Sequence, residues 1–315
     1  MKLSLVVPCY NEEGNIKLFY NEVKKTFEKA GFGFEIVFVN DGSQDGTLRE
    51  LKKLTGGPVP VKIVSFSRNF GKEAAMYAGL EKAEGEYVTV IDADLQQSPS
   101  LALEMVNTLD SKPEYDCIAT YQKERSESKA IIFLKDGFYK IINKFADTEF
   151  KPGASDFRTF RRPMVDAILS MGEYFRFSKG LFSWVGFNTK FIPYKANDRA
   201  TGTSKWSTVK LFKYAFEGIF AFTTAPLRIS TICGLATLFF GLIYLIVTII
   251  RCAKGMIYTA ANSAVMLIFL FAGLGFIFLG IIGEYLARTY IQTKNRPVYI
   301  VKEYIEGGGK EDNNG

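Results

Sequence analysis

The sequence predicts an α/β protein, with a mostly parallel sheet covered by helices and two transmembrane helices towards the C-terminus. Over the first half of the chain, short Val- and Ile-rich runs alternate with amphipathic segments of helical length. This alternation is typical of a parallel sheet with helices on both faces. Two long uncharged stretches follow, each long enough to cross a bilayer. The composition, with 48% apolar and 23% charged residues, is that of a folded protein.

The expected strands are short runs of strand-forming residues at Leu3–Val7, Glu35–Val39, Val61–Ser65, Tyr87–Ile91 and Cys117–Thr120. Between them, Ile16–Ala30 and Lys72–Ala83 carry apolar residues at helical spacing. Polar clusters follow the first four strands, at Pro8–Glu12, Asn40–Ser43, Ser67–Gly71 and Asp92–Asp94. Because the carboxyl ends of parallel strands meet at one edge of a sheet, where α/β proteins bind ligands, the sequence predicts one site built from these clusters.

The two uncharged stretches are Ile229–Ile250 and Thr259–Gly283. At about 1.5 Å per residue each crosses a hydrocarbon core of about 30 Å, and their length disfavours the alternative of two buried core helices. The connecting loop Arg251–Tyr258 is less basic than the outer flanks, which carry Lys205, Lys210, Lys213, Arg228, Arg288, Lys294, Arg296 and Lys302. The positive-inside rule then places both ends in the cytoplasm. The chain starts with an expected strand rather than a signal peptide, so we expect the large N-terminal part to be cytoplasmic.

Two further segments, Lys129–Phe145 and Val209–Phe222, mix Lys with large apolar residues near helical spacing. We interpret both as interfacial helices on the inner leaflet, the alternative being ordinary core-facing amphipathic helices. The expected organisation is a cytoplasmic domain (1–206), an interfacial segment (207–228), a transmembrane hairpin (229–288) and a cytoplasmic tail (289–315). The Gly-, Asn- and acid-rich end of the tail, from Gly307, is expected to be disordered.

The composition excludes several classes of function. The net charge of +6 suits work near anionic lipid but is too small to indicate nucleic-acid binding. The chain has no histidine, which excludes Ser-His-Asp and Cys-His catalysis and imidazole metal sites. Any acid, base or metal ligand is therefore expected to be a carboxylate, and any metal a hard one. The cysteines lack CxxC spacing and are expected to be free thiols in a reducing compartment.

Asp92-Ala93-Asp94 is the central motif. Two carboxylates leaving a buried strand can hold one divalent cation that bridges the phosphates of a nucleotide. Taken alone, the pair is weak evidence, because acidic turns after strands are common. Its position beside Asp41 on a neighbouring strand strengthens the hypothesis. Asp41 itself is either a turn residue that bonds its own backbone or a hydrogen-bond partner for a base or ribose.

These motifs carry a resemblance to a known family. Val7–Glu13, Asn40–Thr47, Ser67–Lys72 and Asp92–Gln96 resemble the family 2 glycosyltransferases of GT-A fold, a Rossmann-like nucleotide-sugar-binding fold. Three later segments, Asp156–Arg158, Arg199–Trp206 and Gly283–Leu286, make the chain similar to the polyprenyl-phosphate sugar transferases, namely dolichol-phosphate mannose synthases and bactoprenol glucosyltransferases. The resemblance covers residues 1 to about 300 of the chain.

The resemblance implies roles for individual residues. The nucleoside would be bound by Pro8, Tyr10, Glu12 and Asp41, with Val39, Lys72, Ala93 and Arg158 also among the substrate-binding residues. Asp92 and Asp94, with Gln96 as a third contact, would hold Mg²⁺ or Mn²⁺ on the diphosphate. Arg199, Ser204 and Lys205 would bind phosphate in a loop that closes over the site. Asp156 matches an acidic position near the reacting centre, so that Asp94, Asp156 and Lys205 form the expected catalytic set. In one departure, Gln122 stands where relatives usually have an arginine.

The chemistry of such an acceptor fits a chain without histidine. A phosphate monoester has a second pKa of about 6, so its attacking oxygen is largely ionised near neutral pH. The reaction then needs positioning and compensation of charge more than a strong base. We therefore favour Asp156 as an orienting or sugar-binding carboxylate over a general base. A structural ion pair between Asp156 and Arg158 is the alternative.

The expected function is inverting transfer of a hexose, with glucose favoured, from a UDP-sugar to undecaprenyl phosphate. It would take place on the cytoplasmic face of a bacterial inner membrane and supply a lipid-linked sugar for cell-envelope glycans. A homo-oligomer formed through the membrane helices and the tail is also expected. GlcNAc, galactose or mannose remain alternative sugars. A processive polysaccharide synthase is disfavoured because the chain lacks a Gln-x-x-Arg-Trp motif. A non-catalytic nucleotide-sugar-binding scaffold is disfavoured because Asp92, Asp94, Asp156 and Lys205 are all present.

Overall fold

The computed structural model describes residues 1–122, 143, 151–195, 225–254 and 260–307. They belong to two compact units, one formed by Met1–Gly218 with Pro297–Gly315 and the other by Ile219–Arg296. The two expected interfacial helices lie outside the described residues, apart from Asn143. The expected phosphate-binding residues Arg199, Ser204 and Lys205 also lie outside them.

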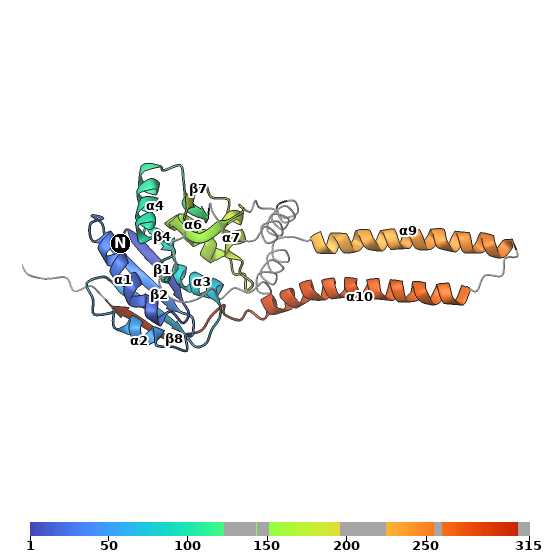
Figure 1. Ribbon diagram of the computed structural model, residues 1–315, viewed down its shortest axis with the longest axis horizontal. Coiled ribbons are helices and arrows are strands. Elements are labelled where there is room, and N and C mark those ends of the chain that lie inside the picture. Colours follow the sequence, from blue (N-terminus) through green and yellow to red (C-terminus); the bar gives the residue numbers. More distant parts are fainter. Residues whose placement is uncertain (123–142, 144–150, 196–224, 255–259, 308–315) are drawn as a thin grey trace, which may run out of the picture. The chain divides into compact units, whose positions relative to one another are not determined.

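The first unit is built on a mixed eight-stranded sheet with the strand order β7-β5-β6-β4-β1-β2-β3-β8 (Figure 1). The strands are β1 (Leu3–Cys9), β2 (Phe34–Asn40), β3 (Val61–Phe66), β4 (Tyr87–Val90), β5 (Cys117–Gln122), β6 (Ala154–Arg161), β7 (Thr189–Tyr194) and β8 (Val301–Gly307). β4, β1, β2 and β3 run parallel. β6 is antiparallel to β4 and β5, and β8 is antiparallel to β3. The predicted α/β class and the five predicted strands are confirmed.

Helices cover both faces of the sheet because successive strand residues point to opposite sides. Ile16 and Phe19 of α1 (Glu13–Phe27) and Met105 of α4 (Pro99–Ser111) pack with Leu5 on one face. On the other face, Val6 packs with residues of α3 (Lys72–Lys82), α6 (Arg162–Ser170) and α7 (Ser178–Trp184). The short α2 (Thr47–Lys52) follows β2. Cys9 and Cys117 are buried free thiols, as predicted.

The structure corrects the expected tail. Residues 289–315 were expected to lie outside the domain, yet Val301–Gly307 forms strand β8 on β3, with Lys62 opposite Glu306 and Ile63 opposite Ile305. The strand alternates Ile305, which packs on the core, with exposed residues, as an edge strand does. Gly307 ends it, so the expected disorder begins no earlier than the following residue. A Cβ at Gly307 would lie 2.3 Å from the Thr55 carbonyl oxygen, which explains the glycine.

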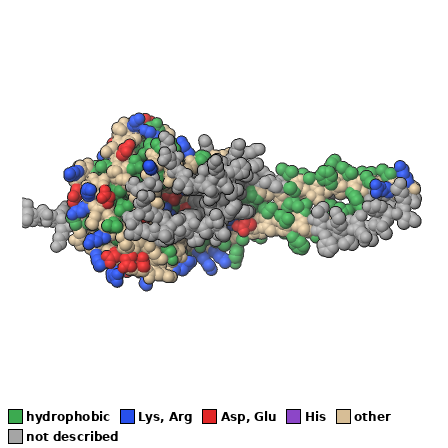
Figure 2. All heavy atoms as spheres, in the orientation of Figure 1, with side chains coloured by type: hydrophobic (Ala, Val, Ile, Leu, Met, Phe, Trp, Pro, Cys, Tyr) green, Lys and Arg blue, Asp and Glu red, His purple; other side chains and the backbone are tan. Residues whose placement is uncertain are grey.

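The second unit contains two long helices, α9 (Ala225–Ala253) and α10 (Ala260–Thr293), which contact each other. Both extend beyond the uncharged stretches, and on the extension of α10 Glu284 and Arg288 form an ion pair of 2.9 Å. By length and composition Ser230–Arg251 and Phe271–Thr293 could each cross a membrane. Their apolar side chains, such as Phe239 and Phe276, are exposed. Figure 2 shows apolar side chains on the surface of these helices. The core helices of a soluble protein are mostly buried, so the finding disfavours that alternative.

Candidate active site

The carboxyl ends of β1, β2 and β3 lie at the same edge of the sheet. Their register places Cys9 opposite Asn40 and Asn40 opposite Ser65. The Asn40 side-chain amide donates a hydrogen bond of 2.9 Å to the Ser65 hydroxyl. The polar clusters that follow these strands therefore come together, as the sequence predicts.

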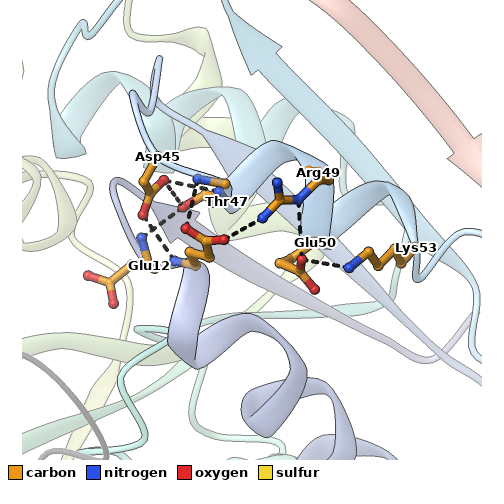
Figure 3. A network of polar contacts seen from close by, with 8 residues as sticks. Glu12, Asp45, Thr47, Arg49, Glu50 and Lys53 are labelled. Atoms are coloured by element: carbon orange, nitrogen blue, oxygen red, sulfur yellow. Dashed lines mark hydrogen bonds and ion pairs between the residues drawn. The ribbon is translucent and has the colours of Figure 1, made fainter.

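A network of polar contacts holds the loop after β1 against the loop after β2 (Figure 3). The Asn11 side chain accepts a 2.9 Å hydrogen bond from the Gln44 amide, and the Glu12 backbone N–H donates one of 2.8 Å to the Thr47 hydroxyl. Asp45 accepts from both the amide and the hydroxyl of Thr47. Burial acts to raise the pKa of Asp45, but these hydrogen bonds leave it below its ordinary value. The network fixes the backbone that presents Tyr10, which is itself exposed.

The Asp41 carboxylate bonds the backbone after β3, whereas one of the two hypotheses had it bond the backbone of its own turn. It accepts hydrogen bonds from the backbone amides of Phe70 at 2.6 Å and Gly71 at 3.0 Å. Burial raises the pKa of Asp41 above its ordinary value, although these two hydrogen bonds act to lower it. The side chain thus holds the loop that leads into α3, rather than its own turn. A contact with a base or ribose stays a prediction.

Lys72 links two of the predicted site carboxylates. Its Nζ lies 2.7 Å from Oδ1 of Asp92 and 3.3 Å from Oδ2 of Asp156. In the antiparallel pairing of β4 and β6, Val90 lies opposite Arg158, so Asp92 after β4 and Asp156 in β6 lie at the same end of this strand pair. Loss of hydration would lower the pKa of Lys72, but the two carboxylates raise it above its ordinary value. The Lys72 side chain, which is 40% exposed, therefore pairs with both carboxylates at this edge of the sheet.

Asp156 is ionised and only partly paired. Burial acts to raise its pKa, but Lys72, Lys179 and Arg158 together hold it below its ordinary value. Its Oδ1 is buried and has no hydrogen-bond partner within the described part of the chain. The structure therefore brings Asp156 into the site with one oxygen unsatisfied.

The alternative interpretation pairs Arg158 with Asp156, and in the structure the charge of Arg158 acts to lower the pKa of Asp156. Its Nε donates to the Ser155 carbonyl at 3.1 Å, and its guanidinium lies 4.9 Å from the centre of the Phe182 ring. The residue is 2% exposed. Arg158 supports the start of β6 from the core, and its contact with substrate stays a prediction.

The turn after β4 orients the Asp92–Asp94 pair. Gln97, which is buried, accepts from the Asp92 backbone amide at 3.0 Å and donates to its Oδ2 at 3.4 Å. Asp94 Oδ1 accepts a 3.2 Å hydrogen bond from the backbone amide of Gln96. Leu95 between them has φ of +58°, in the left-handed region. The side chain of Gln97, which the sequence analysis did not single out, supports Asp92, and a contact of Gln96 with a metal stays a prediction.

The donor atoms of this turn fit a hard divalent cation. Asp92 and Asp94 offer carboxylate oxygens, the ligands that Mg²⁺ and Mn²⁺ prefer. Over the described residues, no group of three or more His, Cys, Asp or Glu converges on one point. Mg²⁺ commonly binds through one or two carboxylates together with substrate phosphates and water. Asp92 and Asp94 would therefore hold the ion together with the diphosphate of a nucleotide.

The remaining predicted substrate-binding residues differ in how far their side chains are exposed. Val39 and Ala93 are buried in the core, so they can offer a ligand only their backbone. Pro8 is half-buried at the end of β1. The Glu12 side chain accepts a 2.6 Å hydrogen bond from Asn15 in the first turn of α1.

Sequence reasoning missed Glu73 and Ser178. The Glu73 carboxylate accepts hydrogen bonds from the Ser178 backbone amide at 2.9 Å and from its hydroxyl. Burial and, after it, the charge of Asp156 raise the pKa of Glu73 to about 7. An acidic residue in the first turn of a helix is an ordinary feature, so no local pattern marks this contact.

Comparisons with known proteins find relatives over most of the chain. Residues 4–169 match the family model described as "Glycosyl transferase family 2". CsbB of Bacillus subtilis (strain 168), named as a glycosyltransferase, is 40% identical over 96% of this chain and 91% of its own. The prophage bactoprenol glucosyl transferase homolog of Escherichia coli (strain K12) is 37% identical over 96% and 99%. Mannosyl-3-phosphoglycerate synthase from Rubrobacter xylanophilus, a solved structure, is 16% identical, with a TM-score of 0.49 over 69% of this chain and 71% of that one.

Proposed function

Because the chain belongs to glycosyl transferase family 2, we propose that it transfers glucose from UDP-glucose to undecaprenyl phosphate, with inversion at the anomeric carbon. The observation that carries the proposal is the pair of carboxylates, Asp92 and Asp156, that share the Lys72 ammonium at the carboxyl end of β4. The relative of Escherichia coli, named for glucosyl transfer to bactoprenol, supports glucose as the sugar and a polyprenyl phosphate as the acceptor.

In the proposed reaction, an oxygen of the lipid phosphate attacks the anomeric carbon of glucose. The new carbon–oxygen bond forms as the bond to the diphosphate breaks, and UDP leaves with the electron pair. The attacking oxygen is already ionised near neutral pH, so the main obstacle is to bring two anions together. A divalent cation on Asp92 and Asp94, with Gln96 beside them, would supply charge neutralisation on the diphosphate.

The side chains of the site have distinct proposed tasks. Lys72 binds the donor diphosphate, while Asp156 orients the sugar through its unsatisfied Oδ1. The nucleoside is bound along the ends of β1 and β2, by Pro8, Tyr10, Glu12, the backbone of Val39, and Asp41. Arg199, Ser204 and Lys205 bind phosphate, and these three lie outside the described residues.

A lipid acceptor requires a site held at a membrane. We propose that α9 and α10 cross the cytoplasmic membrane of a bacterium, with the catalytic unit in the cytoplasm. The chain before α9 and strand β8 after α10 belong to the same folded unit. The two ends of the hairpin must therefore lie on the same side, which requires an even number of crossings. Association of copies through these helices remains an expectation.

The test is transfer by the detergent-solubilised full chain, with Mn²⁺, a short polyprenyl phosphate and a panel of UDP-glucose, UDP-GlcNAc, UDP-galactose and GDP-mannose. We expect a glucosylated lipid from UDP-glucose and less product from the other donors. Preference for another donor would change the sugar but not the reaction. Donor binding without hydrolysis or transfer from any donor would instead favour a non-catalytic nucleotide-sugar-binding protein.

A further inference from the structure

Glu73 joins two helices of the catalytic unit that are far apart in the sequence. It lies in the first turn of α3, and its carboxylate accepts two hydrogen bonds from Ser178, the first residue of α7. Phe177, the residue that precedes α7, makes no capping bond with its side chain. Since the first N–H groups of a helix need partners from outside it, Glu73 caps α7 from another element.

The two joined helices carry the positive charges around Asp156. Lys72 begins α3, directly before Glu73, and lies 3.3 Å from Asp156. Lys179 follows Ser178 in α7, and its charge is close enough to lower the pKa of Asp156. A shift of either helix would therefore move a cation relative to this carboxylate.

Both helices are otherwise fixed by apolar packing on the same face of the sheet. Ala74 and Ala75 of α3 belong to the same buried cluster as Phe182 of α7. The Phe182 ring packs against Phe160 of β6 at 4.9 Å between ring centres. Apolar contacts of this kind are non-directional, so the two directed hydrogen bonds of Glu73 set the relative register of the helices.

The surroundings of the Glu73 carboxylate disfavour its negative charge. Burial and Asp156 raise the pKa of Glu73 to about 7, whereas Ser178 and Lys72 act to lower it. Arg176, which lies over the Tyr77 ring of α3, also faces Glu73. A serine or threonine preceding α7 would cap the helix without this repulsion. The cap of α7 thus comes from Glu73, which directly follows Lys72 in the chain. Its position therefore links α7 to a side chain of the site.

We infer that Glu73 is a positioning residue for the transfer reaction: by holding Ser178, it fixes Lys72 and Lys179 on the two helices that flank Asp156. The inference rests on the proposed function. Both hydrogen bonds from Ser178 end on Oε2 of Glu73, and protonation of the carboxylate removes the negative charge that makes this oxygen a strong acceptor. Transfer should therefore fall as the pH drops through about 7, the pKa of Glu73.

The experiment compares kcat/KM for transfer, from pH 5.5 to 8.5, in the full chain and in Glu73→Ala, Glu73→Gln and Ser178→Ala. Loss of a charge-assisted contact predicts a decrease of about ten- to a hundredfold for Glu73→Ala. Ser178→Ala keeps the backbone hydrogen bond and should lose less. Glu73→Gln keeps a hydrogen-bond acceptor but cannot titrate. The decrease of kcat/KM below about pH 7 should therefore disappear, and only the decrease caused by protonation of the lipid phosphate should remain.

Glu81→Ala is the matched control, because Glu81 is on the same helix and accepts one hydrogen bond from Tyr299. It should behave as the wild type. Hydrogen exchange at residues 178–184 gives a readout independent of activity, and exchange should speed up in Glu73→Ala, less in Ser178→Ala, and not in Glu81→Ala. Wild-type kcat/KM and unchanged exchange in Glu73→Ala would overturn the inference, as would a limb near pH 7 that persists in Glu73→Gln. If Glu73→Ala does not fold, Ser178→Ala decides by the same two measurements. An inactive wild type would refute the proposed function. The comparison of hydrogen exchange would still test whether Glu73 holds α7 through Ser178.

Discussion

The Lys72 ammonium lies 2.7 Å from the Asp92 carboxylate at the carboxyl end of the parallel strands. The same ammonium reaches Asp156, so that two acidic groups from different strands depend on one side chain. Two carboxylates this close repel each other unless a cation lies between them.

Lys72→Met should therefore affect both carboxylates. Without the ammonium the pKa of Asp156 rises, and binding of the UDP-sugar weakens by about ten- to a hundredfold, the usual effect of losing a charge-assisted contact. Calorimetric titration with UDP in Mn²⁺ measures the loss. Lys82→Met, at the other end of α3, is the control and should bind UDP as the wild type does. Equal affinities in the two variants would contradict the role given to Lys72.

Asp94→Ala should abolish the stimulation of transfer by Mn²⁺, because one of the two expected oxygen ligands is lost. The measurement is transfer against Mn²⁺ concentration, starting from protein treated with EDTA. Asp166→Ala removes an exposed carboxylate of α6 and should keep the wild-type response. Full activity of Asp94→Ala in Mn²⁺ would refute the assignment of the metal.

Asp156→Asn should lower transfer and shift the Glu73 limb of the pH profile to lower pH, because the charge of Asp156 helps to raise the pKa of Glu73. Since Lys72, Lys179 and Arg158 keep the pKa of Asp156 below its ordinary value despite burial, the group stays ionised over the whole range from pH 5.5 to 8.5. It therefore contributes no titration of its own there. An acidic limb in the wild type that disappears in Asp156→Asn, together with nearly all activity, would make Asp156 a general base.

Lys62→Met should destabilise the catalytic unit. Lys62 is buried and lies 3.0 Å from Glu35 and 2.7 Å from Glu84. Its loss leaves the Glu35 carboxylate buried without a cation, which costs about 3–5 kcal/mol of unfolding free energy. Lys53→Met removes an exposed pair with Glu50 and should cost much less, because water screens the attraction between exposed charges. Thermal unfolding of the solubilised full chain separates the two, and equal melting temperatures would contradict the prediction.

The membrane topology can be tested by cysteine labelling. In a Cys252→Ser background, Lys254→Cys in the loop between α9 and α10 should react with an impermeant maleimide added outside intact cells. Lys302→Cys, in strand β8 of the catalytic unit, should react only after the cells are opened. Labelling of Lys302→Cys from outside would overturn the proposed orientation.

The central strands could be predicted from the sequence because burial on both faces leaves continuous Val and Ile runs. β6 and β7 give no such signal, since Asp156 and Arg158 stand in β6 and Pro193 in β7. β8 is an edge strand with alternating charges, typical of a solvated tail as well.

In the site, too, some features could be predicted from the sequence and others could not. Asp92 and Asp94 follow a recognisable strand, so their place at the edge could be predicted. The contact between Lys72 and Asp156 depends on the antiparallel pairing of β4 and β6, which no short pattern encodes. Gln97 and Glu73 were missed for a related reason, because each acts through a partner that the local sequence does not mark.

The position of β8 has a consequence for biogenesis. The ribosome makes β8 only after α9 and α10, so the edge of β3 has no partner until both helices have been synthesised. An unpaired strand edge invites association with other chains. Rapid membrane insertion of the hairpin would bring β8 back to its sheet sooner. A delay in insertion would therefore appear as aggregation of the catalytic unit, because the edge of β3 would stay unpaired for longer.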